Sequence, residues 1–206
     1  PQDGHPLPLP VTLQDSSGFN WDLQRNGRIM DGSRDSYDGA ARLQVNGQDF
    51  PEVAQGTASA DGKEVWLGPV QVAGLSVTRR LRVSSEGAGW ARFIDELKND
   101  TPRPVTVNVV ITTDMGSDSD TVVSATSSGD NRLDPEDWGF VTDDGNGGAN
   151  DPVLFHVYGT EGATLPEVSG GNGSDGISYS FPAIALESGQ RKLIAYFEGQ
   201  HAGRDS

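Results

Sequence analysis

Apolar residues recur at every second position in many stretches of this chain, whereas the i, i+3, i+4 spacing of an amphipathic helix is hard to find over any eleven-residue window. In "LSVTRRLRV", one face of a strand would carry Leu75, Val77, Leu81 and Val83. Arg79 interrupts that apolar series. The period of two predicts strands rather than helices, because successive side chains of a strand point to opposite faces.

The same pattern, broken by Gly, Asp, Asn and Pro, divides the whole chain into short segments. The segment 191–197 is apolar on both faces beyond its first residues, which predicts a central strand. Further strands are expected at 11–13, 21–23, 28–30, 41–45, 64–67, 90–97, 105–112, 121–126, 138–141, 153–158 and 177–181. Strands spaced in this way predict an all-β protein, a large two-sheet antiparallel β-sandwich with little or no helix.

The N-terminus has a composition of its own, with prolines at positions 1, 6, 8 and 10. Proline fixes φ and removes an amide donor, so residues 1–10 are expected to form an extended, proline-rich arm, and residues 11–206 a single sandwich domain. Two interpretations stay open. The arm straps its own domain, or it docks on a neighbour and ties copies into a homo-oligomer or fibre by strand addition.

Charge and composition narrow the classes of partner. The 206 residues include 30 acidic and 15 basic side chains, a net charge of −15, which argues against a nucleic-acid partner. No apolar run approaches the roughly 20 residues that span a bilayer, so membrane insertion is not expected. The absence of cysteine excludes disulfides and thiolate chemistry. An acidic, glycine-rich chain of this kind is typical of a secreted or cell-surface bacterial β-protein whose signal peptide has been removed.

Two acidic loops have the composition of calcium sites, because calcium takes six to eight oxygen ligands and glycine lets such ligands converge. The candidate ligands are Asp31, Asp35 and Asp38 in the first loop and Asp143, Asp144, Asn146, Asn150 and Asp151 in the second. The second loop is expected to bind first, since it has more donors and more glycine. The alternative is that both are tight turns whose Asp and Asn side chains bond their own backbone.

Other polar and aromatic groups allow more than one interpretation. The cluster "GDNRLDPEDW" holds Asp134 and Asp137, which would suit glycosidase chemistry only if two carboxylates faced each other at roughly 5–9 Å; a solvated face is the simpler interpretation. Four arginines, at 79, 80, 82 and 92, are expected to pair with carboxylates across strands, or less simply to receive an anionic glycan. The tryptophans at 21, 66, 90 and 138 are candidates for sugar stacking or for the core.

Two segments carry a resemblance. "WARFIDELKNDTPRPVTVNVVITTDMGSDSDT", residues 90–121, and "ALESGQRKLIAYF", residues 185–197, resemble units of secreted bacterial β-sandwiches of the galactose-mutarotase-like supersandwich type. The resemblance covers about 45 residues and implies a long antiparallel sandwich, often non-catalytic and attached to something larger. Mutarotases work with a pair of histidines and a glutamate. Here only His156 lies in the body of a strand, so that catalytic apparatus does not carry over.

Three functions follow as hypotheses. The first is a non-catalytic extracellular or cell-surface sandwich that serves assembly or adhesion and is stabilised by calcium. The second is a carbohydrate-binding module. The third is an accessory domain of a glycoside hydrolase or lyase. No catalytic motif such as GxSxG or HExxH is present, so we do not expect an enzyme.

Overall fold

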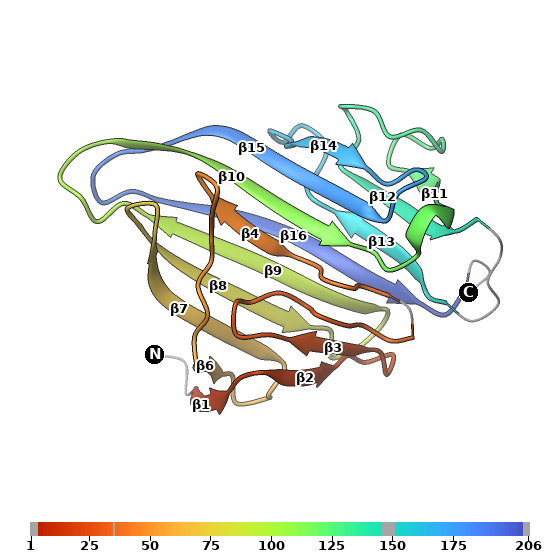
Figure 1. Ribbon diagram of the computed structural model, residues 1–206, viewed down its shortest axis with the longest axis horizontal. Helices are drawn as coiled ribbons and strands as arrows, with labels where there is room; N and C mark the ends of the chain where they lie inside the picture. Colours follow the sequence, from red (N-terminus) through yellow and green to blue (C-terminus); the bar gives the residue numbers. More distant parts are fainter. Residues whose placement is uncertain (1–3, 35, 146–150, 204–206) are drawn as a thin grey trace.

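The computed structural model describes residues 4–34, 36–145 and 151–203, and these form two facing antiparallel sheets and a separate hairpin (Figure 1). The nine-stranded sheet has the order β1 (His5–Pro8), β6 (Gln55–Ala58), β7 (Glu64–Val72), β8 (Leu75–Val83), β9 (Gly89–Lys98), β16 (Arg191–His201), β13 (Val153–Val157), β12 (Gly139–Asp144) and β11 (Thr121–Thr126). The five-stranded sheet has the order β14 (Glu167–Gly170), β15 (Gly176–Leu186), β10 (Val105–Asp114), β4 (Arg42–Val45) and β5 (Gln48–Asp49).

The remaining elements are small. The hairpin consists of β2 (Val11–Gln14) and β3 (Asn20–Leu23), and the helix content of the described residues is one short 3₁₀ turn, η1 (Asp118–Asp120). None of the described helical residues forms a segment long and apolar enough to cross a membrane. The predicted class, an all-β antiparallel sandwich with almost no helix, is confirmed.

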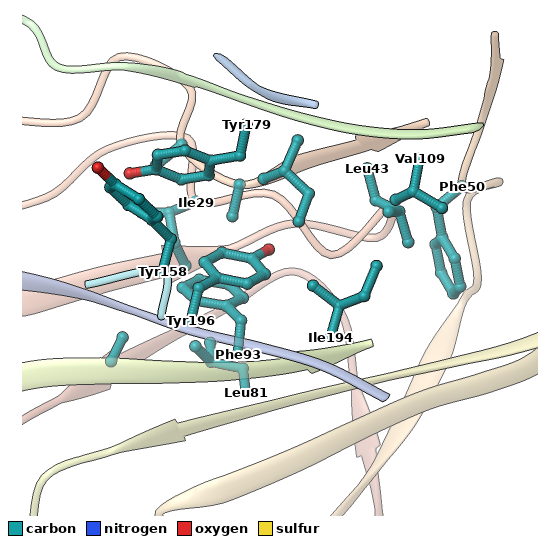
Figure 2. Close-up of a cluster of buried hydrophobic side chains, with 14 of the residues drawn as sticks. Ile29, Leu43, Phe50, Leu81, Phe93, Val109, Tyr158, Tyr179, Ile194 and Tyr196 are labelled. Carbon is teal, nitrogen blue, oxygen red and sulfur yellow. The ribbon is translucent and has the colours of Figure 1, made fainter. Parts of the chain in front are cut away.

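Alternation along each strand builds the core between the sheets. In β8 every odd-numbered residue is buried and every even-numbered one is half-exposed, and β9 follows the same rule. Figure 2 shows part of the interior, where the rings of Phe93 and Tyr196 stack at 5.0 Å and Tyr158 lies against Tyr179. Each large side chain buried in this way stabilises the fold by about 1.5–3 kcal/mol.

The strand predictions differ from the structure mainly where a strand lacks an alternating pattern. Residues 28–30 do not form a strand, although Ile29 makes isolated bridges to Leu23 and Ala40. Four short strands, β1, β5, β6 and β14, were not expected from the pattern. Each has at most four residues, and their partners in the sheet, not their own periodicity, select the extended conformation.

The N-terminal arm is part of the large sheet. Residues His5–Pro8 pair antiparallel with Gln55–Ala58 of the same chain and form an edge strand, and Leu9, which follows, is buried in the core. Proline at two of these positions suits an edge strand, because half of the amide groups there have no neighbouring strand to donate a hydrogen bond to. The described part of the arm therefore straps its own domain, and exchange of the arm between copies stays a prediction.

Deletion of residues 1–8 tests these two roles. The intramolecular pairing predicts a loss of about 1–3 kcal/mol in the free energy of unfolding, because β1 covers the edge of β6 and part of Leu7 packs on the core. The mass in solution, measured by light scattering, should not change. A fall from an oligomer to a monomer would instead support the exchange of arms between copies.

Candidate functional site

The interior contains two clusters of charged groups, and the first lies on the central strands of the large sheet. Arg79 of β8 faces Asp95 of β9 in register, with 2.8 Å between Nε and Oδ1, and both side chains are buried. The guanidinium also donates to the hydroxyl of Tyr196 and to the carbonyl of Ala41, each at 2.7 Å. Burial raises the pKa of Asp95, whereas the charge and hydrogen bonds of Arg79 oppose that rise. The arginine that interrupts the apolar series is thus a core residue.

The second buried cluster joins a histidine to a glutamate. His156 of β13 and Glu198 of β16 are direct cross-strand partners, and Nδ1 lies 2.5 Å from Oε2. Neither side chain has any solvent exposure. The hydroxyl of Tyr179 donates to the other carboxylate oxygen at 3.4 Å, and the ring of Phe140 stacks on the imidazole at 4.7 Å. Burial, and then the negative charge of Glu198, raises the pKa of Tyr179 well above its usual range.

His156 and Glu198 have the chemistry of an acid–base pair, but protein atoms surround both side chains completely. A substrate would need to reach the imidazole or the carboxylate, and a group with zero exposure offers no such approach in this conformation. Sequence patterns did not predict this pair, because its two members are 42 positions apart in the chain. Only the register of β13 on β16 brings them together.

Two serines and a tyrosine of the first acidic loop donate hydrogen bonds to residues of β16. Ser33 donates its amide, and Ser36 its hydroxyl, to the side-chain oxygen of Gln200, at 2.8 and 3.1 Å. Buried Tyr37 donates its hydroxyl to the carbonyl of Gly199 at 3.0 Å. These bonds tie the turns of this segment to β16.

The candidate calcium ligands are only partly within the described structure. Asp31 and Asp38 are exposed in the first loop, Asp143 and Asp144 end β12, and Asp151 precedes β13; Asp35, Asn146 and Asn150 lie outside the described residues. Among the residues that are described, no group of three His, Cys, Asp or Glu side chains is placed to hold a metal ion. Calcium binding by either loop stays a prediction.

The acidic cluster at 130–137 organises a loop through a buried carboxylate. Asp137 accepts the amides of Ser128 and Asp134 and the hydroxyl of Ser127, each at 2.9 Å. Burial alone would raise its pKa, but these donors outweigh burial and hold the pKa of Asp137 below its ordinary value. The loop borders a cleft of about 190 Å³ lined by residues that include Trp138, Val141 and Phe155.

The outer face of the nine-stranded sheet, which points away from the core, carries large side chains in ordered rows. Registers across neighbouring strands define three rows. They are Trp66–Arg80–Ile94–Ala195, Glu64–Arg82–Arg92–Phe197–Val157 and Trp90–Gly199–Phe155–Val141. We call this surface the aromatic–arginine face, after Trp66, Trp90, Phe155, Phe197, Arg80, Arg82 and Arg92.

Its aromatic side chains are half-exposed and hold each other in place. Trp90 and Phe197 pack edge to face with 5.6 Å between ring centroids. Phe155 lies over Gly199, where an added Cβ would come within 1.9 Å of the ring, so the glycine allows the ring to lie on the strand. Of the four tryptophans, Trp21 is fully buried in the core. Two of the other three are on this face, and Trp138 borders the cleft beside it.

The arginines of this face pair with carboxylates across strands and, for Arg82, also in a turn; the cross-strand pairing was predicted from the sequence. Arg80 lies 3.4 Å from Glu96, and Glu64 lies between Arg82 and Arg92 at 3.7 and 3.5 Å. Arg82 also lies 2.7 Å from Asp61, in the turn before β7. Because these pairs are partly exposed to water, each holds its arginine only weakly, and an acidic ligand can compete for the guanidinium groups. The face therefore combines flat apolar rings with a cluster of partly exposed arginines in a chain whose net charge is −15.

Comparison with known proteins identifies the fold. A galactose mutarotase-like protein from Lactobacillus casei superposes with a TM-score of 0.58 at 11% sequence identity, over 93% of this chain and 99% of that protein. A polysaccharide lyase superposes with a TM-score of 0.47 at 15% identity; the chain spans 33% of that protein's length. No protein-family model matches the sequence, and the curated proteins give no match. The chain thus has a mutarotase-like β-sandwich fold, as the resemblance implied.

The buried ion pair makes a specific prediction about stability. Replacing Arg79 by Met leaves the carboxyl group of Asp95 buried without its partner, so we expect a loss of about 3–5 kcal/mol in the free energy of unfolding. Replacing Arg42 by Met breaks an exposed pair with Asp49 and should cost at most about 1 kcal/mol. Urea unfolding measures both, and equal losses in the two variants would contradict a central role for Arg79.

The loop carboxylate makes a prediction about pH. Because the pKa of Asp137 is lowered in the folded state, its contribution is full above the ordinary aspartate pKa of about 3.9 and disappears as the pH falls through the folded value. Asp137→Asn should therefore lower stability by about 1–3 kcal/mol between pH 5 and 8, and the difference from wild type should shrink below about pH 4. A difference that is independent of pH down to the acid transition would show that the charge of Asp137 has no role.

Proposed function

We propose that this chain is a carbohydrate-binding domain, not itself catalytic, that holds a polysaccharide on the aromatic–arginine face. The observation that supports this most directly is the combination of half-exposed indole and phenyl rings with arginines in register on one sheet face. Aromatic rings pack on the apolar faces of sugar rings, and Trp provides the largest surface for such contact. A sheet face of this kind suits a chain-like ligand better than a single sugar.

The spacing of the two tryptophans supports an extended ligand. Trp66 on β7 is in the same cross-strand row as Ile94 on β9, so two inter-strand spacings separate them. Trp90 is four residues from Ile94 along β9. At 4.8 Å between strands and 3.4 Å per residue, the two tryptophans are about 17 Å apart, with Arg82 and Arg92 in the row between them. A ligand that contacts both tryptophans would pass over these arginines.

The arginines favour a polysaccharide that carries carboxylate or sulfate groups. A guanidinium binds such groups with two parallel hydrogen bonds and retains its charge at every physiological pH. An acidic ligand would be repelled by most of this protein's surface, whose net charge is −15, and would be directed to the face where cations gather.

The proposal of a binding role without catalysis is supported by the state of the acid–base groups. The histidine and carboxylate that the fold brings together, His156 and Glu198, have no solvent exposure and are held by Tyr179 and Phe140. The buried Asp137 is committed to the amides of its own loop. We place the protein outside the cell or at its surface, as its acidic, cysteine-free composition indicates.

Assembly or adhesion is a second proposed role, for which an apolar groove beside β16 offers a surface.

The test is the affinity of purified protein for neutral and acidic polysaccharides, measured by calorimetry or on a glycan array. Trp66→Ala should weaken binding at least about tenfold, because truncation of a central Trp removes more than about 1.4 kcal/mol of binding energy. Arg80→Gln should weaken binding of acidic polymers only, and added salt should reproduce that loss.

Trp21→Phe provides the control, because Trp21 is fully buried in the core and is not part of the aromatic–arginine face, so this change should affect stability without affecting affinity. The proposal fails if no polysaccharide binds, or if Trp66→Ala and Trp21→Phe leave equal affinities. Release of a chemically altered sugar by wild-type protein would contradict the non-catalytic part of the proposal.

A further inference from the structure

A gap in the large sheet lies beside β16. That strand runs from Arg191 to His201 and pairs with β9 along its length, but on its other side β13 reaches only from His201 to Phe197. Figure 1 shows β15 and β16 continuing together beyond the ends of β13 and β14. Residues 191–196 therefore present one edge of backbone amide and carbonyl groups that no strand of the described structure covers.

The facing sheet has a matching gap. On β15, β14 covers only Ile177–Ser180, so residues 181–186 also lack a neighbour on that side. Here Pro182 has no amide donor and the register shifts at this point of the strand, which makes the β15 edge a poor template for pairing. An incoming strand would thus pair with β16 and rest its side chains against β15.

An apolar groove of about 650 Å³ occupies this gap. Its walls are Leu193, Ala195 and Phe197 from β16, Phe181 and Ile184 from β15, and the loop that follows Val157. Leu193 is 63% exposed and is one of two large hydrophobic side chains in the described structure with such exposure; the other is Met30, at 53%. Tyr158 also lines the groove, and its buried hydroxyl has no hydrogen-bond partner among the described residues.

The charge of the groove is distinctive in so acidic a protein. Its lining contains Lys192 and not one aspartate or glutamate, although the chain has 30 acidic residues. Lys192 is exposed and has no ion-pair partner in the part of the chain that the structure describes. The neighbouring Arg191 lies at the same end of the strand, 3.6 Å from Glu96.

From this geometry we propose that the groove is a docking site for an extended segment of a partner protein, which adds to the edge of β16 as the missing continuation of β13. A segment of about six residues, roughly 20 Å long, fills the space beside residues 191–196. Running antiparallel to β16, it places an apolar side chain opposite Ile194 and, two positions later on the same face, a carboxylate opposite Lys192.

Two other occupants fit less well. A second copy that paired its own β16 edge here in antiparallel fashion would set each Lys192 opposite Ala195 and each Arg191 opposite Tyr196. Four cations would then enter an interface whose groove lining has no carboxylate to receive them. The N-terminal arm already pairs with β6, and its prolines at 6, 8 and 10 lack amide donors. A polysaccharide would leave the free backbone groups of β16 without regular partners.

The experiment selects ligands from a random heptapeptide library displayed on phage, with the full chain as bait. We expect sequences in which apolar residues alternate and an Asp or Glu stands near the C-terminal end. The synthetic peptide of the enriched sequence should bind at least about tenfold more weakly to Leu193→Glu and to Lys192→Glu. Replacing its acid by Lys should restore affinity for Lys192→Glu, since the charges are then exchanged.

Matched controls are Met30→Glu, at the other exposed large hydrophobic residue, and Arg132→Glu, at a cation with 81% exposure; both should leave peptide affinity unchanged. Circular dichroism verifies that each variant is folded. The inference is overturned if selection on the wild-type protein enriches no sequence that selection on Leu193→Glu does not also enrich. It is also overturned if the peptide binds Leu193→Glu and Lys192→Glu as tightly as wild type. It is equally overturned if light scattering shows a dimer that Leu193→Glu dissociates, or if the groove variants abolish polysaccharide binding instead.

Discussion

The ion pair between Arg79 and Asp95 is the interaction on which the rest of this sandwich depends. It lies on adjacent central strands, and both charges are removed from water. Such a pair is tolerated only when its remaining hydrogen-bonding groups are also satisfied. Tyr196 from β16 and the carbonyl of Ala41 provide that satisfaction, so a single guanidinium holds three strands of the large sheet and the chain that leads into β4 of the other sheet.

The buried His156 and Glu198 extend the same principle toward the other half of the sheet. Glu198 and Tyr196 stand two residues apart on β16 and face the same interior, so one strand carries an acceptor of each polar cluster. Gln200, the next inward residue, accepts hydrogen bonds from Ser33 and Ser36. Interior polar groups thus fix the register of β16, and a fixed register decides which side chains point outward.

The two binding surfaces follow from that register. The outward residues of β16 are Leu193, Ala195 and Phe197, and they contribute to the aromatic–arginine face at one end and to the groove at the other. A shift of β16 by one residue would turn these side chains inward and expose Tyr196 and Glu198, which the buried hydrogen bonds forbid. The geometry of the interior and the chemistry of the surface therefore depend on the same register of β16.

Local sequence alone determined the class of fold and most of its long strands. Alternation in β8 and β10, and the doubly apolar 191–197 segment, is a property of neighbouring residues, because side-chain direction repeats every two positions wherever a strand forms. The cross-strand pairing of the arginines could also be predicted from the sequence, since a charged side chain in a strand of alternating residues favours an oppositely charged partner on a nearby strand. Short strands such as β5 and β14 could not be, because their extended form is imposed by the strands beside them.

Only the tertiary structure decided which residues meet. His156 and Glu198 are 42 positions apart, and the tryptophans of the outer face belong to β7 and β9, so no spacing in the chain predicts either grouping. The groove depends on where β13 and β14 end relative to their longer neighbours, which is a matter of strand pairing rather than of composition. Local preferences act over a few residues, whereas burial, register and the ends of strands result from the packing of the whole sheet.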